Sequence, residues 1–385
     1  MFRLRKILKT ILAPILRIPI VNRWYVVCHA NSEDWIISAR RKYSNSILAK
    51  KQPNSERLSP KDIEDIQSLW NTYSKKYTEL TNLAFYTVYK KYMDISDNLS
   101  DYFPDDFYYC YVDKYFTNYH TSIKLDNKNM YDLYFHDVVR PHTIARKMDG
   151  ILLDRDYNIT SLDKIINSCI ESKDVIIKKS IDSDGGHGVS IVTDCANNTN
   201  LLEQLLGNND DLIIQDLIKQ HPTLASFNPQ SVNTIRIITL NLGVPVVLSS
   251  VFRMGINGSN VDNASSGGIV CGITQDGILK SVAYDSLANQ YLAHPQGLSF
   301  EGVKVPAYDQ CEKIAINLSN RFVNYSRLIS WDFAIDKNGT PLLIEANLTG
   351  GQLDFHQLCN GPIFKPYLNT ILTEIFEKSQ DIKKF

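Results

Sequence analysis

The chain has 385 residues, 44% of them hydrophobic, and its 41 Lys and Arg residues nearly balance 42 Asp and Glu residues, for a formal net charge of −1. This composition excludes a disordered or collagen-like chain, and the length predicts two or three domains. No apolar run reaches the roughly 20 residues that cross a bilayer as a helix, and the balanced charge argues against a nucleic-acid partner.

The basic charge is concentrated at the start of the chain. Residues 1–32 contain six basic residues and no acidic one, whereas residues 33–385 carry a net charge of −7. Helical spacing places apolar side chains on one side of the first turns and lysines opposite, until Pro14 and Pro19 break or kink the helix. Two interpretations stay open: residues 1–22 make a peripheral membrane contact, or they form a helix docked on the protein itself.

Residues 59–125 are expected to be mostly helical. Ser59 followed by proline is typical of a helix start, and we expect one long helix from there to about Lys91. Thirteen of the 21 tyrosines lie between Tyr73 and Tyr134. Such a band suits stacking on sugars or bases, but its helical spacing favours ordinary packing in a core.

From about residue 126 the pattern changes to short β-rich runs separated by turn residues, which predicts an α+β region. The closing stretch places apolar residues at helical spacing and predicts a terminal helix. The predicted strands cover Asp174–Lys179, Asp211–Leu217, Thr234–Leu240, Pro245–Arg253, Ile329–Ile335 and Pro341–Ala346.

The first motif with chemical meaning joins two lysines to a glycine-rich loop and a returning strand. Lys178 and Lys179 end a β-branched strand. The loop then contains Gly185, Gly186, His187 and Gly188. Glycines let backbone N–H groups approach phosphate oxygens, and a lysine supplies the positive charge. It is not a Walker loop, because no Gly-Lys-Ser/Thr follows; by itself the motif is a weak signal and favours a plain hairpin turn.

Polar residues interrupt the next strands. Gln215 and Asp216 end one apolar strand, Arg236 lies inside a second, and Arg253 ends a third. A buried arginine requires anionic partners, either an internal carboxylate or a ligand. The sequence alone leaves both alternatives open.

A hairpin near the end of the chain carries candidate metal ligands. Asp332 lies on its first strand, and Glu345 and Asn347 lie on its second. Because Glu345 and Asn347 are two residues apart, both point to one face of the strand. Carboxylate and amide oxygens are hard ligands that suit Mg²⁺ bridging nucleotide phosphates.

This set of motifs, in this order, resembles the ATP-grasp superfamily. The segments around Gln215, Arg236 and Asp332 resemble those of the ribosomal-protein glutamate ligase. The sugar-transfer-associated ATP-grasp family is more similar still, with helical material before the grasp and an Asn-Thr-x-Arg strand like Asn233–Arg236. The resemblance covers roughly residues 60–375, including Tyr102-Phe-Pro-Asp and Asp126-Asn-Lys128.

The resemblance implies an ATP-grasp fold of two α+β subdomains clasping a nucleotide, preceded by a mostly helical region. The expected divisions are residues 1–58, a basic amphipathic segment and linker; 59–125, the helical region; 126–212, the first subdomain with the glycine-rich lid; and 213–385, the second subdomain with the metal site and C-terminal helix.

The resemblance also assigns roles to residues. Contacts to the nucleotide and its phosphates come from Lys128 and Lys178, with Lys179 as the alternative in register, and from the lid residues Gly185, Gly186, His187 and Gly188. The adenine hinge comprises Gln215, Asp216, Leu217 and Ile218. The catalytic residues are Arg236, Arg253 and Lys178, and the ligands of two Mg²⁺ ions, replaceable by Mn²⁺, are Asp332, Glu345 and Asn347.

The implied reaction is ATP-dependent ligation of a carboxylate to an amine through an acylphosphate. The family association suggests a sugar acid of a surface polysaccharide, free or lipid-linked, joined to an amine or amino acid. A phosphotransferase and a catalytically silent nucleotide-binding adaptor are the alternatives. Seven scattered cysteines without a C-x-x-C pair predict neither a disulfide framework nor a zinc site, which fits the cytoplasm, with the inner membrane face as a further location.

Overall fold

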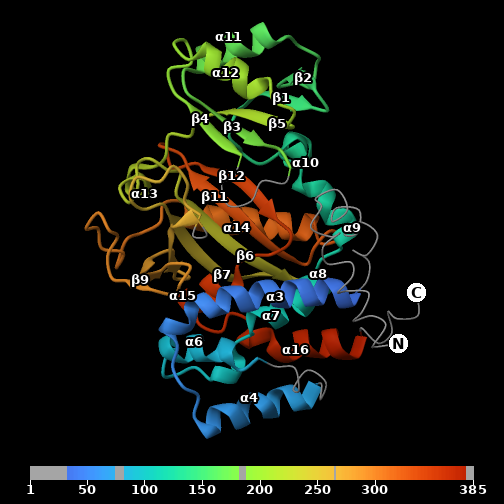
Figure 1. Cartoon of the computed structure of the whole chain (residues 1–385), viewed down its shortest axis with the longest axis vertical. Coiled ribbons are helices and arrows are strands. Elements are labelled where there is room, and N and C mark those ends of the chain that lie inside the picture. Colours follow the sequence, from blue (N-terminus) through green and yellow to red (C-terminus); the bar gives the residue numbers. More distant parts are fainter. Residues whose placement is uncertain (1–32, 74–81, 182–187, 264–265, 379–385) are drawn as a thin grey trace, which may run out of the picture.

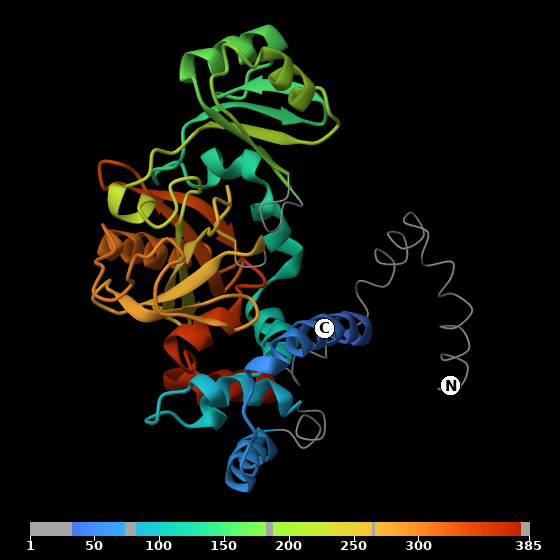
Figure 2. The same cartoon turned by 60° about the vertical axis from the view of Figure 1, so that its left-hand side comes forward.

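The computed structural model describes residues 33–73, 82–181, 188–263 and 266–378. The basic segment 1–22 and three lid residues, Gly185, Gly186 and His187, lie outside these described residues. The described chain forms three tiers, with a small sheet at one end, a large sheet in the middle and a helical region at the other end (Figure 1; Figure 2). Among the described residues, no helix is both long and apolar enough to cross a membrane.

The helical region begins with a long helix and continues through shorter ones. Its elements are α3 (Glu33–Lys51), η2 (Gln52–Asn54), α4 (Pro60–Tyr73), α6 (Ala84–Tyr92), η3 (Leu99–Asp101), α7 (Asp105–Phe107), η4 (Tyr108–Val112), α8 (Asp113–Phe116), α9 (Tyr119–Ser122) and η5 (Ile123–Asp126). Ser59 and Asp62 cap α4 reciprocally, because the Asp62 N–H donates to Ser59 Oγ and the Ser59 N–H to Asp62 Oδ2. The expected single helix to Lys91 is wrong: residues 82–83 are not helical, and α6 starts anew at Ala84.

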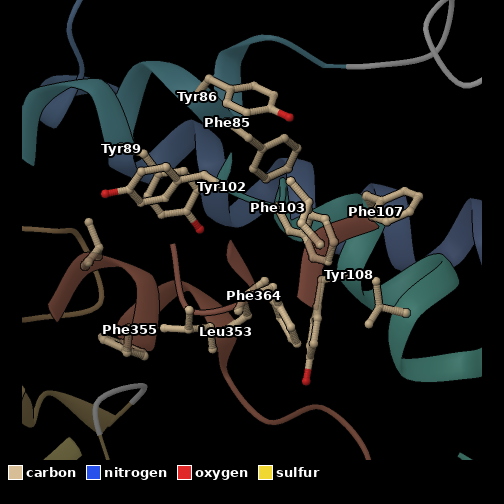
Figure 3. Close-up of a cluster of buried hydrophobic side chains, with 14 of the residues drawn as sticks. Phe85, Tyr86, Tyr89, Tyr102, Phe103, Phe107, Tyr108, Leu353, Phe355 and Phe364 are labelled. Atoms are coloured by element: carbon tan, nitrogen blue, oxygen red, sulfur yellow. The ribbon is translucent and has the colours of Figure 1, made fainter. Parts of the chain in front are cut away.

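Most of the tyrosine band packs in an aromatic core (Figure 3). Trp70 and Tyr86 are fully buried, and the Trp70 indole donates to the Tyr86 hydroxyl at 2.8 Å. Phe103 stacks on Phe364 from the C-terminal part of the chain, with ring centroids 5.0 Å apart. Distant segments therefore share one core. The C-terminal elements in it are α15 (Leu353–Asn360), η8 (Lys365–Tyr367), α16 (Leu368–Thr373) and η9 (Glu374–Lys378).

The small sheet has the strand order β2-β1-β5-β3-β4, and all its pairings are antiparallel. Helices α11 and α12 bury one of its faces (Figure 1). The other face looks toward the large sheet. The elements of this tier are η6 (Lys128–Met130), α10 (Tyr131–Tyr134), β1 (Thr143–Met148), β2 (Ile151–Asp154), α11 (Leu162–Ser172), β3 (Val175–Lys179), β4 (Val189–Val192), α12 (Thr199–Leu206) and β5 (Leu212–Asp216).

The large sheet has the order β10-β9-β8-β7-β6-β11-β12 and is also antiparallel. Its elements are α13 (Pro222–Ala225), β6 (Thr234–Asn241), β7 (Pro245–Met254), β8 (Ile269–Ile273), β9 (Leu279–Tyr284), β10 (Gln290–Tyr291), α14 (Tyr308–Arg321), β11 (Leu328–Ile335) and β12 (Pro341–Asn347). Each of the six predicted strand runs corresponds to a strand.

The two faces of the large sheet have different coverings. Residues such as Ile235 and Ile237 on β6 belong to the core beneath α14. On the opposite face, the same strand begins with Thr234 and Arg236 and continues with Ile238, which belongs to the core of the helical region. The polar start of β6 and the helical region therefore share one face of the sheet.

Candidate active site

A cavity of about 1160 Å³ lies between the two sheets and beside the helical region. Its charged lining residues are the bases Lys128, Lys178, Lys219, Arg236 and Arg253 and the acids Asp262, Asp332 and Glu345. Five bases against three acids leave an excess of two positive charges among the described lining residues. Such a cavity favours an anionic ligand.

Asp332, which lines the cavity, accepts hydrogen bonds from two arginines. It faces Arg236 across the β6–β11 pairing. The Arg236 guanidinium donates to its Oδ1 at 2.7 Å and to Oδ2 at 2.6 Å, and Arg253 Nη1 donates to Oδ2 at 3.0 Å. Burial alone would raise the pKa of Asp332, but the two arginines hold it below its usual value.

Arg253 keeps donors for a further partner. Its side chain is almost fully buried, and no hydrogen-bond partner meets its Nε within the described part of the chain. The carboxylate of Asp262 is 3.8 Å from its Nη2, beyond hydrogen-bonding distance, and is itself held by Thr234. A buried guanidinium with an unsatisfied N–H suits an anion arriving in the cavity.

Glu345 and Asn347 lie on β12, next to Asp332 on β11. Glu345 is the register partner of Asp332, and its Oε1 contacts Lys128 Nζ at 2.7 Å. The pairing slips after Asp332, so that Ile344 lines the cavity together with Glu345 and Asn347. A bulge of this kind turns neighbouring side chains toward one side.

These residues fit a Mg²⁺ ion held jointly with phosphates. Both Asp332 oxygens already accept hydrogen bonds from arginines, and Asn347 Nδ2 lies 3.3 Å from Asp332 Oδ2, which turns its amide oxygen away from Asp332. Among the described residues, no three acidic, histidine or cysteine side chains could by themselves hold a metal. Mg²⁺ commonly needs only one or two protein ligands when substrate phosphates and water complete its shell. Glu345 and Asn347 meet that requirement directly.

Lys178 lies in the cavity, whereas Lys179 does not line it. Strand alternation sends Ile176 and Lys178 toward the cavity, while Lys179 is 39% exposed and pairs with Asp210 at 2.9 Å. Burial, followed by repulsion from Lys128, lowers the pKa of Lys178 to about 8.

The hinge residues divide into two groups. Leu217 and Ile218 line the cavity. Gln215 lies behind them, accepting from Lys178 Nζ at 3.4 Å, and Asp216 turns to His142 at 3.1 Å. The hinge therefore contributes apolar side chains, and Gln215 positions Lys178.

Gly188 is the lid residue that the structure describes. It has φ +75°, and a Cβ there would lie 2.6 Å from Lys179 Cγ. Its carbonyl accepts from the Lys179 N–H at 3.0 Å. Glycine therefore permits both the turn and the approach of the lysine stem.

Several lining residues were not predicted as site residues. Asp262 lies in the polar loop after Arg253, in the segment Val261–Asn263 that resembles a metal-site segment of the ribosomal-protein glutamate ligase, but it was not itself predicted as a ligand. Gln352, whose Oε1 accepts from Arg236 Nη1 at 2.8 Å, carries no recognisable motif. Tyr43 and Tyr109 come from the helical region and also line the cavity.

Two solved structures are similar to this chain, at low identity. D-alanyl-alanine synthetase A from Vibrio cholerae O1 biovar eltor is 12% identical, with 68% of each chain covered and a TM-score of 0.43. The D-alanine-D-alanine ligase from Coxiella burnetii is 12% identical over 70% of this chain and 62% of that chain, with a TM-score of 0.40. No curated protein sequence matches the chain.

The family comparison covers most of the molecule. The model of a family described as sugar-transfer associated ATP-grasp matches residues 109–373. That range begins in η4 of the helical region and contains both sheets and every charged lining residue of the cavity. The chain belongs to the sugar-transfer associated ATP-grasp family.

Proposed function

We propose that the protein is an ATP-dependent carboxylate–amine ligase that forms an amide through an acylphosphate. The observation that carries the proposal is the positively charged cavity between the two sheets, with Lys178 on one side and the buried Arg236–Asp332–Arg253 group on the other. Phosphoryl transfer requires positive charge around the equatorial oxygens of the moving phosphoryl group. The cavity offers that charge from both sheets.

In the first step, a carboxylate oxygen of the acceptor attacks the γ-phosphorus of ATP, the bond to the bridging oxygen breaks, and ADP leaves. In the second, the nitrogen of an amine attacks the acyl carbon, phosphate leaves with the electron pair of the broken C–O bond, and the nitrogen loses a proton. No serine or cysteine nucleophile is needed. The six described cysteines are buried and form no disulfide.

Each side chain has a role that follows from its place. Lys178 neutralises nucleotide phosphate, Arg253 directs its unsatisfied N–H at the transferring phosphoryl or the acceptor carboxylate, and Asp332 keeps both arginines oriented. Glu345 and Asn347 would hold the Mg²⁺ ion, which when bound offsets phosphate charge. Leu217 and Ile218 provide the apolar surface for adenine.

We infer a sugar-derived carboxylate as the acceptor, because the family description names an association with sugar transfer and the proposed reaction begins at a carboxylate. We infer a role in surface polysaccharide assembly, with the reaction in the cytoplasm, at the inner membrane face if the acceptor is lipid-linked. The amine, or amino acid, completes the substrate pair.

The test measures ADP release with Mg²⁺, a panel of sugar acids and either amines or hydroxylamine, which traps an acylphosphate as a hydroxamate. Glu345→Ala should lower kcat at least 100-fold, because it removes a side chain proposed to hold the Mg²⁺ ion that offsets the charge of the phosphates. Glu203→Gln, on an exposed position of α12, should be indistinguishable from the wild type.

The other outcomes identify the alternatives. A phosphate-bearing product detected by mass spectrometry would make the protein a phosphotransferase. Tight nucleotide binding without ADP release across the panel, together with partner binding that Glu345→Ala leaves intact, would make it an adaptor.

A further inference from the structure

The cavity has two chemically different ends. Beneath the small sheet its wall is apolar, made by Ile176, Val189, Ile191, Leu217 and Ile218. Beside the helical region its wall is aromatic and polar, made by Tyr43, Tyr109, Thr349, Gly350 and Gln352. The apolar end suits the adenine base. The other end is therefore the place for the second substrate of the proposed ligase.

The helical region fixes the loop that forms this second end. Asp113, at the start of α8, accepts a hydrogen bond from the Gly350 N–H at 3.2 Å. Thr117 Oγ1 donates to the Leu348 carbonyl at 2.9 Å. A Cβ at Gly351 would collide with Ser330 Oγ and lie 3.2 Å from the Tyr108 hydroxyl. Residues 348–352 are therefore held in place by side chains of the helical region.

The same loop reaches the phosphoryl-binding arginines. Gln352 has φ +57°, a left-handed conformation that is costly for this residue type. In that conformation its Oε1 accepts from Arg236 Nη1 at 2.8 Å. An acceptor lying against the loop therefore lies beside Arg236, which Asp332 links to Arg253.

Tyr43 is the unusual member of this wall. It lies on α3 and is 63% exposed, although nearly all described tyrosines elsewhere in the helical region are buried or partly buried. Tyr109 lies deeper, with its ring edge-on to Tyr108 at 5.0 Å. An exposed aromatic face beside a ligand cavity offers an apolar platform for a flat or ring-shaped group.

Three further lining residues suit hydroxyl groups. Gln230, Asn260 and Thr349 carry amide or hydroxyl side chains that both donate and accept hydrogen bonds. A ligand with several hydroxyls matches these side chains, a carboxylate matches the arginines, and a ring matches the aromatic face of Tyr43.

We propose that the helical region forms the acceptor subsite, and that Tyr43 makes the enzyme select a cyclic, polyhydroxylated carboxylate over an open-chain one. The proposal rests on the proposed function, which it deepens by naming the part of the chain that binds and selects the acceptor. Tyr43 is a specificity-determining residue here, and the nucleotide end of the cavity is independent of it.

D-glucuronate and D-gluconate are the probes, because both are six-carbon hydroxylated monocarboxylates and D-glucuronate closes into a pyranose ring. Binding to the full chain with ADP and Mg²⁺ is measured by saturation-transfer NMR titration. The wild type should bind D-glucuronate at least tenfold more tightly than D-gluconate. Tyr43→Ala should lose most of this preference, and Tyr43→Phe, which keeps the aromatic face, should retain it.

Ile95→Ala is the matched control, because Ile95 is a fully exposed apolar side chain of the same region that does not line the cavity. It should bind both probes as the wild type does. In turnover with ATP and hydroxylamine, Tyr43→Ala should raise the KM for D-glucuronate about tenfold with little change in kcat, and the Kd for ADP should stay constant in all variants.

Three results would overturn the proposal: no saturable binding of either probe, equal binding of both by the wild type, or an unchanged preference in Tyr43→Ala. The binding measurement needs no turnover, so it is separable from the proposed function. Absence of ADP release with every carboxylate overturns the ligase reaction. ADP release together with an unchanged preference in Tyr43→Ala overturns only this inference.

Discussion

At the scale of single residues, the site depends on Asp332. It supplies one negative charge to two buried guanidiniums, and both of its oxygens are used. An ion pair of this kind adds little net stability over an apolar replacement, yet removing one partner leaves buried charge unpaired. Asp332 therefore holds Arg236 and Arg253 in place, and its loss would leave two buried positive charges without their shared carboxylate.

Asp332→Asn should lower the free energy of unfolding by about 3 kcal/mol, because Arg236 and Arg253 lose their shared countercharge. Urea unfolding followed by circular dichroism measures this. Asp309→Asn, at a position with a 71% exposed side chain, is the control and should change stability by less than about 0.5 kcal/mol. Equal midpoints for the two variants would contradict the role given to Asp332.

Lys178 makes nucleotide binding depend on pH. Its pKa of about 8 reflects burial and the repulsion of Lys128 and Arg140, opposed by Glu345 and Asp262. Bound phosphates favour the charged lysine, so ADP affinity should be nearly constant below pH 8 and fall up to roughly tenfold for each pH unit above it.

A fluorescent ADP analogue, titrated from pH 6.5 to 9.5 without metal, measures that profile. Lys178→Arg should remove the dependence above pH 8, because a guanidinium stays charged. Lys179→Met should retain it, because Lys179 lies on the other face of β3. An unchanged profile in Lys178→Arg would assign the titration to another group.

At the scale of elements, a buried ionic cluster fastens the helical region to the C-terminal part of the chain. Lys51 at the end of α3 pairs with Asp354 on α15, and Tyr89 on α6 donates to Asp105 on α7 at 2.6 Å. Burial, and then the Asp354 carboxylate, raises the pKa of Asp105 to about 7. Four helices therefore meet at one titratable site.

This cluster should make stability fall as pH rises. Between about pH 4 and pH 7 the folded chain keeps a proton on Asp105 that the unfolded chain has released, so the free energy of unfolding decreases with pH in that window. Asp105→Asn removes this contribution, and its stability should vary less between pH 4.5 and pH 7.5 than that of the wild type. Urea unfolding at those two pH values measures the difference, with Asp309→Asn as the control. The same change in the free energy of unfolding for Asp105→Asn and the wild type would contradict the role given to Asp105.

At the scale of the whole molecule, the described chain forms three tiers (Figure 2), and residues from all three line one cavity. The small sheet supplies apolar surface and Lys178, the large sheet supplies the arginines and acids, and the helical region supplies Tyr43 and Tyr109. Because the described residues pack into three separate cores, the cavity lies where these cores end. Polar side chains at these boundaries line the cavity and are not packed inside a hydrophobic core.

The basic segment at residues 1–22 predicts a property of the whole chain. If it is a membrane contact, the full chain should sediment with vesicles containing anionic phospholipid, weakly at high salt, and a chain lacking residues 1–22 should stay in solution. Both forms should bind ADP equally. Unchanged sedimentation after the deletion would favour the alternative of a segment docked on the protein.

Much of this protein was predictable because its signals are local. Periodicity located the six strands, and the resemblance carried by residues around Arg236, Asp332 and Glu345 predicted the ATP-grasp family and the α+β fold, both now confirmed. Strands β1, β2, β8, β9 and β10 were not predicted, because their residues lack a distinct apolar alternation.

The tertiary structure decided what depends on pairing between distant residues. Helices α11 and α12 cover the face of β3 that carries Val175 and Ile177. Lys178 lies on the opposite face and lines the cavity, whereas Lys179 does not. That Asp332 binds arginines follows from the register of β6 against β11. The sequence by itself determined which residue types could bind a nucleotide, but only the packed sheets brought Gln352 and Tyr43 to the same cavity, because no local pattern encodes contacts that span hundreds of residues.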